Sequence, residues 1–304
     1  MSRTLIAGGT GFIGQQLAIK LAKLGHEVIA LGTSKRTCSN LVKNGVKVIF
    51  TDLSKTPLAS AVENIHFEYV INLSGYIDHS TIENGGLDVF KAHTKCAITL
   101  INGVDRNTLR TFVQIGTSDE YGDTVAPQSE TAREQPVAPY SLAKLCNTHL
   151  IQMLARNESF PGVVVRPFLV YGPGQSLSRL IPFLIQQSLN DRHFDTSPGE
   201  QLRDFLYIDD FCDGVISLFD QNTHYGKIFN IASGEATSVR KVIETVIKVT
   251  GGGIANFGGK PYRVGESMAL YANIEAITAA TGWRPKTSLQ DGLRLTTESI
   301  RSSG

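Results

Sequence analysis

The stretch that decides the fold is residues 4–14, which read TLIAGGTGFIG. An apolar run stops at two glycines, and apolar residues then recur at positions 13, 17, 21 and 24, which is a helical period. A glycine-rich turn between a strand and a helix lets the backbone approach a pyrophosphate at the positive end of the helix dipole. The stretch therefore predicts a dinucleotide site, with cofactor contacts from Gly8, Gly11, Phe12, Ile13 and Gly14.

The rest of the chain predicts a Rossmann-type α/β fold with a smaller C-terminal lobe. Apolar strands are expected at residues 27–31, 46–50, 69–73, 111–115 and 162–166, with helices at 12–24, 56–62, 87–105 and 140–157. Such alternation favours a doubly wound parallel sheet with right-handed crossovers. We expect a cofactor domain over residues 1–170, to which segments near 204–231 return, and a substrate lobe mainly over residues 171–304. In this second half of the chain we expect helices at 178–189, 209–219, 237–249, 273–281 and 289–300 and strands at 201–207 and 228–231.

Composition excludes several classes of protein. The 304 residues carry a formal net charge of +1, so nothing favours a nucleic-acid partner. No apolar run approaches ~18 residues, and the N-terminus lacks the pattern of a signal peptide, so we expect no membrane contact. The four cysteines form no C-x-x-C pair and the histidines form no cluster, which predicts free thiols, a cytoplasmic location and no metal. Glycine accounts for 29 of the 304 residues, which is a larger share than the usual ~7%. These glycines should therefore mark special backbone positions.

The end of the second predicted strand indicates which dinucleotide binds. Residues 31–36 read LGTSKR, with no carboxylate to hold a ribose 2′-hydroxyl. Two cations there could neutralise a 2′-phosphate, so Thr33, Ser34, Lys35 and Arg36 predict NADP(H), although a solvated basic turn is the alternative. Further expected cofactor contacts follow the third and fourth predicted strands at Asp52, Leu53 and Leu73.

A tyrosine and a lysine stand one helical turn apart, at Tyr140 and Lys144. The i, i+4 spacing places both side chains on one helix face. A phenol with a pKa of about 10 is a poor acid–base group at neutral pH, and a nearby ammonium lowers that pKa. In isolation a surface pair would be the better interpretation. Here the pair follows a hydroxyl-bearing strand end, Thr117-Ser118, in a dinucleotide fold, which favours catalysis.

Together these residues resemble the extended short-chain dehydrogenase/reductase family of sugar-nucleotide epimerases, dehydratases and 4-ketoreductases. Four further strings match family signatures in order: GTSDEYG (116–122), RPFLVYGPG (166–174), RDFLYIDD (203–210) and GWRP (282–285). The resemblance implies that Tyr140 exchanges a proton with the sugar, that Lys144 holds the nicotinamide ribose, and that Thr117 binds the reacting oxygen. It further implies substrate contacts from Ser118, Asp119, Arg203 and Arg263, the two arginines holding a diphosphate, and a homodimer. For each arginine a structural role is the alternative.

Three reactions share this scaffold. A 4,6-dehydratase usually has Asp-Glu directly after the threonine, whereas here Ser118 intervenes before Asp119 and Glu120. The missing carboxylate after the second strand suits a reductase that consumes NADPH. TSDEYG resembles strings of 4-keto-6-deoxysugar reductases, and so does GEQLRDF (199–205), which is similar to the CDP-abequose and CDP-paratose synthase group. We therefore expect NADPH-dependent reduction of the C4 ketone of a nucleotide-linked deoxysugar, as in O-antigen or lipopolysaccharide precursors. The alternatives are a C4 epimerase, then a 4,6-dehydratase, then an NADPH-binding sensor. Asn72 and His93 depart from the family pattern, and their roles are open.

Overall fold

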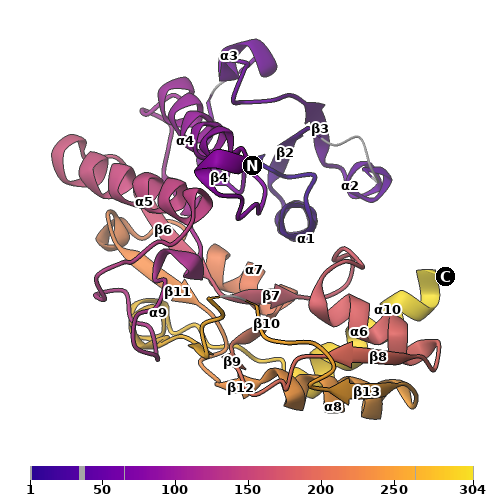
Figure 1. The fold of residues 1–304 in the computed structure, drawn as a ribbon. Helices are drawn as coiled ribbons and strands as arrows, with labels where there is room; N and C mark the ends of the chain where they lie inside the picture. Colours follow the sequence, from indigo (N-terminus) through magenta and orange to yellow (C-terminus); the bar gives the residue numbers. More distant parts are fainter. Residues whose placement is uncertain (1, 34–37, 65, 264, 304) are drawn as a thin grey trace. The chain divides into compact units, whose positions relative to one another are not determined.

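The structure is a computed structural model that describes residues 2–33, 38–64, 66–263 and 265–303. The chain divides into two compact units, each of which is described separately (Figure 1). The first unit comprises residues 1–122, 132–167 and 212–229, and the second comprises residues 123–131, 168–211 and 230–304.

A seven-stranded sheet organises the first unit, in the spatial order β11-β6-β5-β4-β1-β2-β3. The strands are β1 (Arg3–Ala7), β2 (Glu27–Gly32), β3 (Lys47–Phe50), β4 (Tyr69–Asn72), β5 (Thr111–Ile115), β6 (Gly162–Pro167) and β11 (Ile228–Ile231). The pairs from β6 to β3 are all parallel. The order reverses beside β1, which is the switch point where doubly wound folds bind ligands at the carboxyl ends of the strands. The predicted fold class is confirmed.

Helices cover both faces of this sheet. They are α1 (Phe12–Lys23), α2 (Ser39–Lys43), α3 (Leu58–Ala61), α4 (Gly86–Gly103) and α5 (Pro139–Glu158), with the short turns η1 (Ile82–Asn84), η2 (Ser118–Glu120) and η3 (Asn222–His224). Helices α4 and α5 pack side by side (Figure 1). Alternate strand residues such as Leu5, Val70 and Phe112 are fully buried in one core with Leu100 of α4 and Ile151 of α5. This burial of apolar side chains fixes α4 and α5 over the strands that carry the site.

The second unit contains three small sheets. Strand β7 (Leu169–Tyr171) pairs with β10 (Phe205–Tyr207), β8 (His193–Thr196) pairs with β13 (Ile254–Phe257), and β9 (Leu202–Arg203) lies between β12 (Thr237–Ser238) and β14 (Ala269–Leu270). Its helices α6 (Leu180–Leu189), α8 (Val239–Thr250) and α10 (Leu289–Ser303) pack together, while α9 (Glu275–Thr281) follows β14. Helix α7 (Ile208–Ile216) leads from the second unit into residues of the first. Ser238 caps α8, because its Oγ accepts a hydrogen bond from Lys241 N at 3.2 Å.

The predicted single strand over residues 201–207 is wrong, because it is broken at Asp204 into β9 and β10. The Asp204 carboxylate is fully buried and accepts hydrogen bonds from the backbone amides of Ser233 (2.6 Å) and Gly234 (2.9 Å). A buried carboxylate needs such donors, and turning toward them interrupts the ladder. The short strands β7, β8, β12, β13 and β14 were not expected, since two to four residues carry too little periodicity.

Candidate active site

The glycine turn between β1 and α1 has the backbone shape that a pyrophosphate needs. Gly8 has φ +78°, and a Cβ there would lie 2.5 Å from Leu73 O, at the end of β4. A Cβ on Gly9 would lie 2.6 Å from that of Ala30, and one on Gly14 would lie 2.6 Å from Gly9 Cα. A side chain at any of these positions would fill the cradle or separate helix from strand. Helix α1 starts at Phe12 with Gly11 as its N-cap, so no side chain covers its first turn. These residues fit a dinucleotide.

The other predicted cofactor contacts lie around the same sheet edge. Thr33 follows β2 and is exposed, whereas Ser34, Lys35 and Arg36 lie outside the described residues. Asp52 Oδ1 accepts hydrogen bonds from Ser54 N (3.0 Å) and Ser54 Oγ (2.6 Å), which closes the turn after β3 and lowers the pKa of the Asp52 carboxyl. Leu53 is buried, and Leu73 is partly buried directly after β4.

Lys144 and Tyr140 lie in the first turns of α5, which begins at Pro139. Proline suits this position because its fixed φ is helical and the first turn needs no N–H. Both side chains are only 5% exposed. The Lys144 Nζ donates a hydrogen bond to Ile115 O, at the end of β5, at 3.0 Å. Burial lowers the pKa of Lys144 to about 8, against the opposing charge of Glu120.

Thr117 follows β5 and caps the turn η2. Its Oγ accepts a hydrogen bond from Asp119 N at 3.2 Å, and its own amide donates to Glu120 Oε1 at 2.9 Å. This reciprocal capping box holds the backbone at the strand end. Thr117 and Ser118 are buried, while the Asp119 side chain is 31% exposed. The Lys144 bond to Ile115 O ties α5 to this strand end, two residues before Thr117.

Two histidines pack against the ring of Tyr140. His79 stacks on it with ring centroids 5.5 Å apart and planes at 15°, and its Nε2 lies 3.4 Å from Asp119 Oδ2. His93, from α4, meets the ring edge-on at 5.3 Å and 79°. Aromatic contacts of this kind hold a ring in one orientation. Sequence reasoning missed His79, because its only signal is a turn-forming DHS string after β4.

His93 is buried and neutral at physiological pH. Its Nε2 lies 2.9 Å from Tyr76 O and 3.3 Å from Tyr76 N, so this nitrogen donates to the carbonyl in one tautomer and accepts from the amide in the other. Burial, and then the charge of Lys144, lower the pKa of His93 to about 4. His93 is therefore a packed neighbour of the Tyr140 ring.

Asn72 joins the ends of two strands. Its Nδ2 donates to Gln114 Oε1 at 2.9 Å across β4 and β5, and its Oδ1 accepts from Ser74 Oγ at 2.5 Å. Since Asn72 is buried, these bonds satisfy its amide and fix the loop that follows β4. Asn72 therefore links β4 to β5 and to the segment that follows β4.

The two predicted diphosphate arginines belong to the second unit. Arg203 lies in β9, donates to Leu202 O at 2.8 Å and forms an ion pair with Glu266. This ion pair is in keeping with the structural role given above as the alternative for Arg203, and sequence reasoning missed Glu266 as its partner. Arg263 is exposed. Of these two arginines, Arg203 is therefore already paired with a carboxylate, and Arg263 is exposed to solvent.

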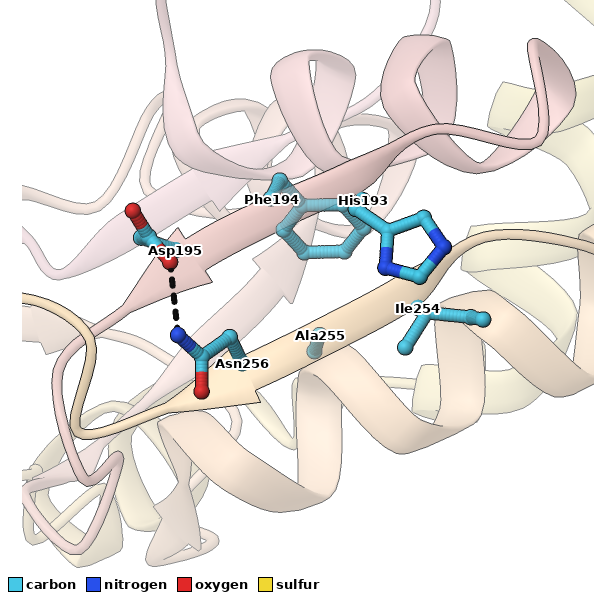
Figure 2. A pocket seen from close by; sticks show the side chains of 6 residues that line it. All are labelled: His193, Phe194, Asp195, Ile254, Ala255 and Asn256. Carbon is cyan, nitrogen blue, oxygen red and sulfur yellow. Dashed lines mark hydrogen bonds between the residues drawn. The ribbon is translucent and has the colours of Figure 1, made fainter.

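A pocket in the second unit contains none of the predicted site residues. It is lined by the side chains of β8 and β13, where Asn256 Nδ2 donates to Asp195 Oδ1 at 2.8 Å (Figure 2). Ile254 and His193 stand beside each other on the same pair of strands, and both are exposed. Across the described ranges of the chain no group of His, Cys, Asp and Glu could hold a metal ion, and no helix there is long and apolar enough to cross a membrane.

The family described as NAD dependent epimerase/dehydratase matches residues 4–232, and the chain belongs to it. It is 28% identical over 305 residues to an uncharacterized UDP-glucose epimerase of Bacillus subtilis, covering 96% of this chain and 95% of that protein. It is 25% identical to dTDP-4-dehydro-6-deoxyglucose reductase of Escherichia coli, covering 98% and 97%. A structure of UDP-glucuronic acid 4-epimerase from Bacillus cereus, with UDP-glucuronic acid and NAD, has a TM-score of 0.84 and 26% identity and covers 99% and 100%.

The chain is thus an enzyme of a family that uses NAD(P) and modifies nucleotide-linked sugars. The names of its relatives include epimerases, dehydratases and one reductase.

Proposed function

We propose that this chain catalyses reversible oxidation and reduction at C4 of a nucleotide-linked sugar. The observation that carries the proposal is that Lys144, on the helix of Tyr140, donates a hydrogen bond to Ile115 O at the end of β5. Thr117 follows two residues later, and His79 contacts both the Tyr140 ring and Asp119 of the turn η2. A dinucleotide held by the glycine turn would supply or accept the hydride at C4. Tyr140 takes the proton of the C4 hydroxyl during oxidation and returns it to the C4 oxygen during reduction.

The neighbours of Tyr140 support this role. Lys144 lies on the same face of α5, and its ammonium favours the phenolate because opposite charges attract. Thr117 donates its hydroxyl proton to the C4 oxygen and so orients the sugar. Ser118 and Asp119 extend the polar edge toward other sugar oxygens. As the resemblance implies, Arg203 and Arg263 are the candidate contacts for the substrate diphosphate.

The relatives favour a C4 epimerase as the overall reaction, since epimerase names predominate among them. In that case the cofactor is regenerated within each turnover, and no net oxidation or reduction occurs.

The second candidate is net reduction of a 4-keto-deoxysugar with NADPH. One observation favours it: β2 ends at Gly32 and is followed by Thr33, with no carboxylate to select NAD. The expected contacts of Thr33, Ser34, Lys35 and Arg36 with a 2′-phosphate belong to this candidate. The reductase of Escherichia coli, which matches over nearly the whole chain, is consistent with it.

Cofactor turnover separates the two candidates. The protein is incubated with UDP-linked hexoses and NAD, and separately with CDP-, dTDP-, GDP- and UDP-linked 4-keto-6-deoxysugars and NADPH. An epimerase interconverts the C4 isomers with no change in absorbance at 340 nm. A reductase oxidises one NADPH for each ketone reduced. A protein that binds the cofactor but does neither is the sensor alternative.

We also infer a homodimer, as the resemblance implies. Large apolar side chains on α4 and α5 are exposed, among them Ile98 (41%), Leu142 (44%) and Met153 (36%). Light scattering should give twice the 33.0 kDa chain mass, and Leu142→Glu with Met153→Glu should give the monomer.

A further inference from the structure

Behind Thr117 lies a carboxylate to which the mechanism above gives no part. Glu120 has no exposed surface. Its Oε1 accepts the Thr117 amide at 2.9 Å, and its Oε2 accepts the hydroxyl of Thr148 at 2.9 Å. Thr148 is on α5, four residues after Lys144 and eight after Tyr140, so the three side chains share one face of that helix. One carboxylate thus joins the Thr117 turn to the helix of the tyrosine and the lysine.

Burial raises the pKa of the Glu120 carboxyl, and the charge of a buried arginine opposes that rise. Arg166, in β6, has no exposed surface and donates from Nε to Glu120 Oε2 at 2.9 Å. Its Nη2 donates to Glu134 Oε1 at 2.7 Å, and its guanidinium lies 4.5 Å from the centre of the Tyr121 ring. Two carboxylates and a ring therefore surround one guanidinium. A buried pair with this many hydrogen bonds is a rigid support, although it contributes little net stability.

The strand end is shaped to receive this carboxylate. A Cβ on Gly116 would run into Glu120 Oε1, so glycine is the residue that fits there. The Gly116 amide donates to Val165 O at 2.7 Å, next to Arg166 in β6. Ile115 O on one side accepts Lys144 Nζ, and the Thr117 amide on the other donates to Glu120. Residues 115–117 are thus restrained from both ends.

We propose that Glu120 is a positioning residue that sets the distance between the Thr117 hydroxyl and the Tyr140–Lys144 face of α5, and this inference rests on the function proposed above. Glu120 bonds to the backbone amide of Thr117 and to the hydroxyl of Thr148, and in this proposal it does not touch the substrate. It acts through the Thr117 backbone and through Thr148. A displacement of the order of 1 Å at such a site costs up to about a hundredfold in turnover, even when binding is unchanged.

The test uses the full chain in three variants. Thr148→Val removes the link from Glu120 to α5 and leaves the buried charge pair intact. Glu120→Gln keeps the acceptor for the Thr117 amide and removes the charge, and it serves as the conservative comparison. Thr296→Val is the matched control, because Thr296 is also a buried helical threonine, with its hydroxyl donating to Gly292 O at 2.7 Å, and it lies in the second unit.

The first readout needs no turnover: hydrogen–deuterium exchange of the amides in residues 116–121. We expect about tenfold faster exchange in Thr148→Val than in wild type and no change in Thr296→Val. The second readout is the split between kcat and KM on whichever nucleotide sugar the wild type converts. We expect kcat to fall about tenfold or more in Thr148→Val, with KM for the cofactor within about twofold.

The pH dependence of kcat distinguishes a positioning role of Glu120 from a general effect on folding. The Glu120 charge raises the pKa of Lys144, so its removal in Glu120→Gln should move the alkaline decline of kcat to lower pH, whereas Thr148→Val should leave that decline in place. Unchanged exchange or unchanged kcat in folded Thr148→Val overturns the proposal. A wild type that converts no nucleotide sugar refutes the proposed function instead, and exchange in 116–121 still decides whether Glu120 restrains the turn.

Discussion

The Lys144 Nζ donates a hydrogen bond to Ile115 O at 3.0 Å, and this joins helix α5 to the end of β5. The same carbonyl accepts a second bond from Gln114 Nε2 at 3.0 Å. A cation buried against a neutral carbonyl is disfavoured, and burial lowers the pKa of Lys144 from 10.5 to about 8. Lys144, which the proposed mechanism needs, therefore lowers the free energy of unfolding of the protein.

Replacement of Lys144 should make the protein more stable and less active. Between about pH 8 and 10.5 the unfolded chain binds more protons at this site than the folded chain, so stability rises with pH there. Below pH 8 the burial of the charged Lys144 lowers the free energy of unfolding by its full amount, about 3 kcal/mol. Lys144→Met, which leaves Ile115 O bonded to Gln114, should be the more stable protein at pH 7. Urea unfolding from pH 7 to 10 should show this advantage shrinking, and a constant difference would contradict the buried-charge argument.

His93 should make the fold sensitive to acid. Its pKa falls from 6.5 in the unfolded chain to about 4 in the folded protein. Over that interval the unfolded state binds more protons, so stability is lost as the pH falls, by up to about 3 kcal/mol. His93→Asn can keep a hydrogen bond toward Tyr76 O and has no proton to gain. The free energy of unfolding of this variant should decline less between pH 6.5 and 4; parallel curves would exclude His93 as the cause.

The ring of His79 should hold Tyr140 in its orientation. A stacked aromatic pair contributes about 1 kcal/mol beyond its buried area. His79→Ala should lower kcat about fivefold, and His79→Phe, which keeps a flat ring, should recover most of it. Steady-state kinetics on the converted nucleotide sugar is the measurement. If His79→Phe is as impaired as His79→Ala, the imidazole nitrogens matter and stacking is not the explanation.

Thr33 offers a test of the cofactor preference, since it is exposed directly after β2. Thr33→Asp places a carboxylate where a 2′-phosphate is expected, and the two anions repel. We expect NADPH to bind about tenfold more weakly and NADH to bind no worse. Thr33→Asn is the uncharged control. Fluorescence titration measures both affinities, and equal losses for the two cofactors would mean that the 2′-phosphate lies elsewhere.

The elements of the first unit could be read from the sequence because their apolar residues recur at a clear period. The helix expected at 12–24 spans Phe12–Lys23, and the strand expected at 111–115 is β5. The placement of Tyr140 and Lys144 on one helix was predictable because the i, i+4 spacing sets a shared helix face, whereas their chemistry stays a prediction. The second unit was harder, since its strands are two to four residues long.

Contacts made across sequence distance were not readable. His79 contacts Tyr140, and Glu120 bonds to Thr148. Both contacts depend on how the loop after β4 and the turn η2 pack on α5. The carboxylate pair Asp119-Glu120 shows the limit clearly. Sequence placed both near Thr117, but only the fold reveals that one side chain is partly exposed beside His79 and the other is buried against Arg166.

The measurement that tests the central claim most directly compares wild type with Tyr140→Phe on the panel of nucleotide-linked sugars and both cofactors. The variant lacks the hydroxyl that the proposed mechanism uses to exchange the proton at C4, and it keeps the ring that His79 and His93 contact. We predict that wild type converts at least one of these sugars at C4, and that the variant binds the same cofactor but turns over at least about a hundredfold more slowly. Full turnover by Tyr140→Phe would contradict the account.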